Sequence, residues 1–283
     1  MPRRWIAAVA AAAVAAVGIA CEGGGTGHPG PSRSPTHRHA ASIAALGDSI
    51  STAFGSCLSL ISCPRNSWST GSSTRVDSIR SRLMADDPGL DLTPHNEAVA
   101  GARAAALPDQ AGAAVRHRAD YVTLLVGAND ACRPDIDQMT PVAEFRADVD
   151  RALRVLRDGR PRAQVLVASV PDLNRLWSVG HTDRLAVRVW AHGVCPALLA
   201  NPTSTSATDV RRRAAFAARI DAYDDQLAAA CSGYGRRCRY DGGAVHRVAF
   251  SKDMVNPLDF FHPDVDGQQA LAATAWRAWR LGG

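Results

Sequence analysis

The sequence has little of what marks several common protein classes. Lys252 is the only lysine, aromatic residues make up 6% of the 283 positions, and no internal repeat is visible. Charged residues account for 21% and hydrophobic residues for 46%, proportions that exclude a mostly disordered chain and a polytopic membrane protein. The composition predicts a soluble protein with one large domain or two smaller ones.

The motifs of three other function classes are also missing. The densest basic cluster, at residues 211–213, has no interleaved aromatic residues, so we expect no nucleic-acid partner. No CxxC or HxxxH pair occurs, so we expect neither a metal nor another cofactor. The GxSxG motif of ordinary α/β-hydrolases is absent as well.

The first 40 residues predict export. A pair of arginines precedes the uncharged, alanine-rich stretch 5–20, and this order is typical of a secretory signal peptide, which we assign to residues 1–20. Cys21 follows small residues at the expected cleavage site and is a candidate for lipidation. Residues 21–40 would then form a flexible Gly/Pro/Ser tether. The alternative is an uncleaved membrane anchor, although a bilayer span needs about 20 apolar residues.

Cysteine counting supports the same location. Setting Cys21 aside leaves an even number of cysteines, which suits disulfide bonds in an oxidising compartment. The sequence alone does not choose among the many connectivities, but a sequential scheme keeps two of the loops short: Cys57 with Cys63, Cys132 with Cys195, and Cys231 with Cys238. We expect a protein that is secreted or lipid-anchored at a bacterial cell surface.

Apolar runs alternate with helical patterns along the chain. Three β-rich runs are of the kind buried in a parallel sheet: 43–46, 121–126 and 164–169. Apolar spacing or cap signals predict helices elsewhere, at 145–156, 208–230 and 265–281. The segment 176–206 has no clear period and is interpreted as a long ordered loop beside the site. The alternation predicts an α/β fold with helices on both sheet faces and ligands at the carboxyl ends of the strands.

Several segments carry groups suited to chemistry. The first run leads into Gly47-Asp48-Ser49, where the hydroxyl could act as a nucleophile, although a serine there is more often a helix cap. Asn129, in GAND after the second run, could stabilise an oxyanion, although such a tetrapeptide also suits a plain turn. Gly101, in NEAVAGA, would let a backbone N–H approach a ligand closely.

Near the C-terminus, Asp259 precedes His262 by three residues. Within one turn, a carboxylate at this spacing can accept a hydrogen bond from Nδ1 of the imidazole and leave Nε2 as a base. An isolated histidine is more often a surface residue, but its pairing with an acid just before the last expected helix favours a catalytic interpretation.

Taken together, the four segments resemble, in residue identity and order, the sequence blocks of the SGNH (GDSL-type) hydrolase superfamily, from about Ser42 to the C-terminus. The resemblance implies a flavodoxin-like, three-layer α/β/α sandwich with a central parallel sheet, formed by residues 41–283. The cysteines at 57 and 63, followed by NSWSTG, look most like the secreted bacterial esterase and lipase branch.

The resemblance also implies roles, residue by residue. Ser49 matches the family nucleophile, His262 the general base and later acid, and Asp259 the carboxylate that orients the imidazole. The backbone N–H groups of Ser49 and Gly101 and the side-chain amide of Asn129 match the three oxyanion-hole donors.

These roles predict an exported serine esterase or lipase that cleaves acyl lipids or small acyl esters through an acyl-enzyme intermediate. A deacetylase of O-acetylated cell-wall sugars and a noncatalytic surface lipoprotein stay as alternatives. A metal-dependent phosphoesterase would need a DxH on the first strand, where Asp48-Ser49-Ile50 stands. Asp48 and Asp130 are expected in turns, without a proton-transfer role. We expect a monomer, with a membrane tether only through Cys21.

Overall fold

The computed structural model describes residues 39–281, and a sheet of five parallel strands lies at their centre. The strand order is β2-β1-β3-β4-β5. The strands are β1 (His39–Gly47), β2 (Leu90–Asn96), β3 (Tyr121–Leu125), β4 (Gln164–Val167) and β5 (Cys238–Tyr240). This is the flavodoxin-like order, in which the chain leaves β1 and β3 toward opposite faces and opens a crevice between their carboxyl ends.

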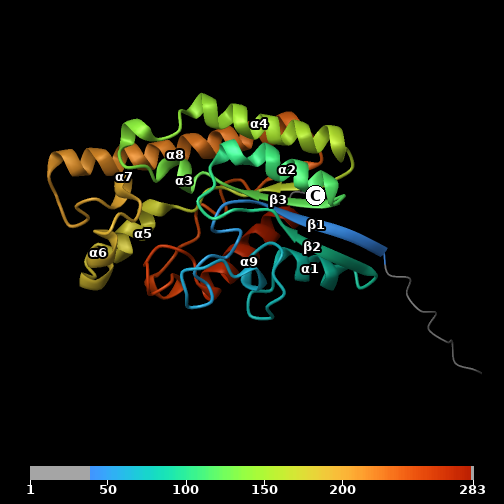
Figure 1. Ribbon diagram of the computed structural model, residues 1–283, viewed down its shortest axis with the longest axis horizontal. Helices are drawn as coiled ribbons and strands as arrows, with labels where there is room; N and C mark the ends of the chain where they lie inside the picture. Colours follow the sequence, from blue (N-terminus) through green and yellow to red (C-terminus); the bar gives the residue numbers. More distant parts are fainter. Residues whose placement is uncertain (1–38, 282–283) are drawn as a thin grey trace, which may run out of the picture. The chain divides into compact units, whose positions relative to one another are not determined.

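Helices cover both faces of the sheet, which confirms the predicted three-layer α/β/α fold (Figure 1). One layer contains α2 (Leu107–Arg116), α4 (Val142–Gly159) and α8 (Ala207–Tyr234), and the other contains α1 (Ile79–Asp86) and α9 (Val265–Leu281). None of the described helices combines the length and apolarity that a bilayer crossing requires.

The core is divided by the sheet because neighbouring residues of a strand point to opposite faces. Ala44 and Leu46 of β1 are fully buried against the α2, α4 and α8 layer. Ile43, from the same strand, and Leu166 of β4 are buried on the side of α1 and α9. The predicted apolar runs are therefore interior strands that are covered on both faces.

The segment 176–206 was expected to be a long loop, and that expectation is wrong. It contains most of α5 (Leu173–Gly180) and all of α6 (Arg184–Trp190) and α7 (Pro196–Leu199). Each helix is too short for a repeated apolar stripe. The first two begin instead at aspartate caps, because the side chains of Asp172 and Asp183 accept hydrogen bonds from backbone N–H groups of the first turn.

The boundary of the folded region also differs slightly from the expected position at residue 41. His39 and Ala40, assigned to the tether, lie in β1 and pair with the first residues of β2. β2 itself was not anticipated, because it contains Pro94 and mostly polar residues, which an edge strand tolerates. The predicted signal peptide, Cys21 and the rest of the tether lie outside the described residues.

Three disulfides connect the cysteines in the sequential scheme: Cys57–Cys63, Cys132–Cys195 and Cys231–Cys238. The second joins the end of the short helix α3 (Ala128–Ala131) to the start of α7. It therefore fastens the segment after β3 to the helical region between β4 and α8.

Candidate active site

The candidate nucleophile follows directly from the carboxyl end of β1. Gly47 has a φ of +135°, a conformation that disfavours other residues, and a Cβ there would collide with the carbonyl oxygen of Leu125 on β3. The next carboxylate, Asp48, accepts a hydrogen bond from the N–H of Ile50 at 2.9 Å and closes the turn. Ser49 is thus presented where β1 and β3 separate.

Two buried glutamines hold this turn from opposite layers. Gln110 of α2 accepts a hydrogen bond from the N–H of Gly47 at 2.7 Å and donates to its carbonyl at 2.9 Å. Gln268 of α9 donates to the carbonyl of Ile50 at 2.9 Å and accepts from the N–H of Trp68 at 2.9 Å. Neither glutamine was expected from the sequence, since no local motif surrounds them.

Ser49, His262 and Asp259 form one continuous hydrogen-bonded chain. Nε2 of His262 lies 3.0 Å from Oγ of Ser49, and Nδ1 lies 2.7 Å from Oδ2 of Asp259. Such a chain lets an imidazole accept a proton from a hydroxyl while a carboxylate fixes the ring orientation.

The DxxH segment is shaped by its own hydrogen bonds. Oδ1 of Asp259 accepts from the N–H groups of Phe261 at 2.8 Å and His262 at 3.0 Å, so the carboxylate is fixed by the turn that carries the imidazole. Phe260 between them adopts a positive φ of 51°, and its carbonyl accepts a hydrogen bond from the Trp190 indole. The ring of Phe54 packs against His262 with centroids 4.7 Å apart. These contacts leave one orientation for the imidazole.

The backbone N–H groups of Ser49 and Gly101, both at the site, have no acceptor within the described part of the chain. Gly101 has a φ of +83° and open space where a Cβ would lie. The Asn129 amide donates one hydrogen bond to the carbonyl of Ala102 at 3.1 Å, which leaves its second N–H for a ligand.

Asp130 ties the same two segments together. Its Oδ2 accepts a hydrogen bond from the N–H of Ala104 at 3.0 Å, and with the Asn129 bond it fixes the segment after β2 to the segment after β3. Asp130 is completely buried, and this burial raises the pKa of its carboxyl. Burial likewise raises the pKa of Asp48 to about 7. One oxygen of each carboxyl has no hydrogen-bond partner among the described residues.

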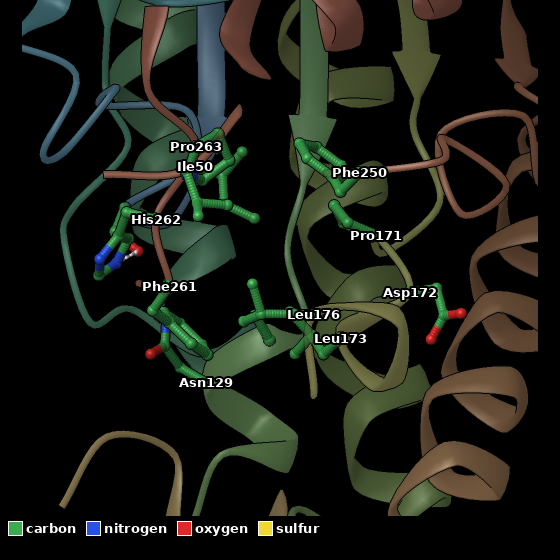
Figure 2. A pocket seen from close by; sticks show the side chains of 13 residues that line it. Ile50, Asn129, Pro171, Asp172, Leu173, Leu176, Phe250, Phe261, His262 and Pro263 are labelled. Carbon is green, nitrogen blue, oxygen red and sulfur yellow. Dashed lines mark hydrogen bonds between the residues drawn. The ribbon is translucent and has the colours of Figure 1, made fainter. Parts of the chain in front are cut away.

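A pocket opens beside Ser49 and has a polar side and an apolar side. Figure 2 shows His262 and Asn129 on one side, with Leu173 and Leu176 beyond them. Most of the lining is aliphatic or aromatic, and the whole set is Ser49, Ile50, Ala128, Asn129, Pro171, Asp172, Leu173, Leu176, Phe250, Val255, Phe261, His262 and Pro263. The space between these residues amounts to about 490 Å³ when the part open to solvent is included, and its cavity volume is only about 30 Å³. It can hold an apolar group next to a reactive hydroxyl.

Comparisons with known proteins support the fold. No curated protein matches the chain. Among solved structures, TesA has a TM-score of 0.53 at 16% identity, over 85% of this chain and 98% of that one. A family 3 carbohydrate esterase of Clostridium thermocellum has a TM-score of 0.50 at 12% identity, over 87% of this chain and 100% of that one. At such identities the similarity establishes the fold.

The family assignment comes from the sequence pattern of the domain as a whole. The model of the GDSL-like lipase/acylhydrolase family matches residues 45–270, which include the serine turn, Gly101, Asn129 and the DxxH segment. The chain belongs to the GDSL-like lipase/acylhydrolase family.

Proposed function

We propose that the protein is an exported serine esterase that hydrolyses carboxylic esters with an apolar acyl group. Membership of the GDSL-like lipase/acylhydrolase family supports hydrolase activity. The observation that carries the finer proposal is the hydrogen-bonded chain from Ser49 through His262 to Asp259, which opens into a mainly apolar pocket.

In the first half of the reaction, Oγ of Ser49 attacks the ester carbonyl while Nε2 of His262 takes the hydroxyl proton. Asp259 accepts the hydrogen bond from Nδ1, keeps the tautomer that leaves Nε2 unprotonated, and stabilises the imidazolium that forms. The imidazolium then protonates the leaving alcohol as the tetrahedral intermediate collapses. In the second half, a water molecule attacks the acyl-enzyme with the same base, and the acid and Ser49 are released.

The negative charge of the tetrahedral intermediate needs donors that are already in place. The N–H groups of Ser49 and Gly101, both without another acceptor in the described region, and the second N–H of Asn129 supply them. Because the three donors come from segments that are hydrogen-bonded to one another, little reorganisation accompanies charge development.

The acyl group would bind against the apolar side of the pocket. Leu173, Leu176 and Phe250 lie beyond the candidate catalytic groups, and burying an acyl chain there gains about 0.8 kcal/mol per CH₂. An O-acetylated sugar would place only its acetyl methyl there, because the sugar is the alcohol part of that ester. The apolar side therefore favours esters of longer acyl chains over the O-acetylated sugar alternative.

Exposed aliphatic residues near the site support lipid esters as substrates. Leu58 and Ile61 lie in the loop closed by Cys57–Cys63, a few residues after the nucleophile, with exposed fractions of 74% and 63%. Leu258, next to Asp259, is also half exposed. Exposed aliphatic side chains in the chain segments that adjoin the catalytic residues can contact a lipid surface without loss of a folded core.

Export is supported by the three disulfides, which are typical of oxidising compartments. Lipidation of Cys21 would then anchor the enzyme at the cell surface. The intact mass of the protein from its native host tests this point. Two or three added acyl chains in the membrane fraction support the anchor, and an unmodified Cys21 N-terminus in the culture fluid rejects it.

The test of activity is hydrolysis of p-nitrophenyl esters of increasing acyl length, with a serine-directed phosphonate as inhibitor. We expect the rate to rise from acetate to longer acyl chains and the phosphonate to label Ser49, as identified by peptide mass. EDTA should leave the labelling unchanged. A folded protein that hydrolyses none of these esters and is not labelled contradicts the proposal and favours the noncatalytic alternative.

A further inference from the structure

Three side chains that commonly bind metal ions meet away from the catalytic pocket, where the carboxyl end of β2 lies beside the end of α2. His95 and Glu97 are at the end of β2, and His117 caps α2. One ligand atom from each lies within 4.8 Å of the others. Nε2 of His117 is 3.4 Å from Oε1 of Glu97, and the two imidazole rings stack with centroids 4.0 Å apart.

The backbones that carry these three side chains are all fixed to β1. His95 lies opposite Ala44 in the ladder between the two strands. The N–H of Glu97 donates to the carbonyl of Ala45 at 2.9 Å, and the carbonyl of His117 accepts from the hydroxyl of Ser42 at 3.0 Å. Only side-chain rotation is therefore needed to bring the ligand atoms around a common centre.

The donor set selects a class of ion. Two imidazoles and one carboxylate suit zinc and related divalent transition metals, whereas calcium and magnesium prefer all-oxygen sites. Among the described residues, no hydrogen bond occupies a nitrogen of the His95 ring.

We propose that His95, Glu97 and His117 bind one divalent transition-metal ion of the zinc type, with water completing its coordination. Tetrahedral zinc, with bonds of about 2.0–2.2 Å, places its ligand atoms about 3.3 Å apart. The pair formed by His117 and Glu97 already has this spacing, so the His95 ring supplies most of the adjustment.

The ion would have a structural role. None of the three ligands lines the catalytic pocket, and the bound ion would join the end of β2 to the end of α2. Glu97 lies four residues before Gly101, so the ion would also hold the start of the segment that carries a candidate oxyanion donor. The sequence does not reveal the site, because residues 95 and 117 have no metal-motif spacing and only the fold brings them together.

Zinc titration calorimetry of the full chain, prepared without an added histidine tag, tests the proposal. We expect the wild-type protein to bind one Zn²⁺ that His95→Ala and His117→Ala each weaken by at least about tenfold. His192→Ala, which removes an exposed histidine outside the cluster, should bind as the wild type does. His95→Gln serves if the alanine variant does not fold, because it keeps a polar side chain at the strand end.

Two further readouts separate a specific site from loose binding. Co²⁺ in place of Zn²⁺ should give visible absorption bands of a nitrogen- and oxygen-ligated ion in the wild type and not in the double variant His95→Ala/His117→Ala. Zn²⁺ at about 100 times its Kd should raise the Tm by about 5–10 °C in the wild type alone. If the double variant binds Zn²⁺ with wild-type stoichiometry and affinity, the assignment is wrong.

Discussion

Nε2 of His262 lies 3.0 Å from Oγ of Ser49, although 213 positions separate the two residues in the chain. Ser49 follows the first strand and His262 precedes the last helix, so the contact exists only when the sheet and α9 are both in place. The reactivity of the hydroxyl therefore depends on the whole fold.

Substitution within this chain of hydrogen bonds should separate the roles of its members. We expect Ser49→Ala and His262→Ala each to lower kcat by several orders of magnitude, because the nucleophile or its base is lost. Asp259→Asn should lower kcat less than Ser49→Ala does, because His262 is then misoriented but still present as a base. Steady-state kinetics on a p-nitrophenyl ester, with circular dichroism as a folding control, measure the effect. Wild-type turnover by folded Ser49→Ala would contradict the assignment of the nucleophile.

Removal of the Asn129 amide should act chiefly on the transition state, although it also removes the hydrogen bond to the Ala102 carbonyl. One oxyanion donor typically contributes about 2.7–4 kcal/mol, so Asn129→Ala should reduce kcat about 100- to 1,000-fold with little change in KM. The separate determination of kcat and KM checks this. A change confined to KM would make Asn129 a residue that positions the substrate.

Gln268 has a matched control beside it in α9. Gln268→Ala leaves the N–H of Trp68 and the carbonyl of Ile50 buried without their partner, which should cost about 2–5 kcal/mol of unfolding free energy and lower kcat. Gln269→Ala, at an exposed position, should stay within about 0.5 kcal/mol of the wild type. Urea denaturation of the two variants makes the comparison. Equal stability of the two variants would show that the hydrogen bonds of Gln268 do not hold the serine turn.

Asp48 should make the stability of the protein depend on pH. Burial raises the pKa of Asp48 in the folded protein from 3.8 to about 7. The contribution of the protonated carboxyl to the free energy of unfolding is therefore fully present below about pH 4 and is lost as the pH rises through 7. Asp48→Asn should remove this loss, at most about 4 kcal/mol, while its amide oxygen still accepts from Ile50. Urea denaturation from pH 4 to 8 measures it, with the exposed Asp91→Asn as control. If the free energy of unfolding changed with pH in the same way for Asp48→Asn and the wild type, Asp48 would not be the source of the pH dependence.

The disulfides should differ in their contribution to stability. Cys132 and Cys195 are separated by 63 positions and Cys231 and Cys238 by 7, so the chain-entropy model gives about 4 and about 2 kcal/mol for the two bonds. The double serine variant at 132 and 195 should therefore unfold at the lower temperature. Calorimetric scans of both double variants test the order, and equal Tm losses would count against an entropic origin.

The features predicted correctly are those that a short segment encodes. The buried strands appear as runs of β-branched and aliphatic residues, and the start of α9 is marked by Pro263 just before it. The serine turn and the DxxH segment are local motifs, and the structure brings Ser49, Asp259 and His262 within hydrogen-bonding distance.

The features that were missed depend on contacts between distant segments. The buried Gln110 bonds to Gly47 across 63 positions and has no motif of its own. β5 has only three residues and forms because β4 offers it a partner edge. The helices α5 and α6 are too short to show a period and are recognisable only from the caps Asp172 and Asp183.

The bond from Gln268 to the serine turn also determines when hydrolysis can begin. Gln268 and His262 both follow residue 261 in the sequence, so a polypeptide synthesised only up to that residue has neither the proton acceptor nor the bond to Ile50. Such a chain carries a hydroxyl no more reactive than any other serine. Hydrolytic activity thus arises only after the last helix has docked against the serine turn.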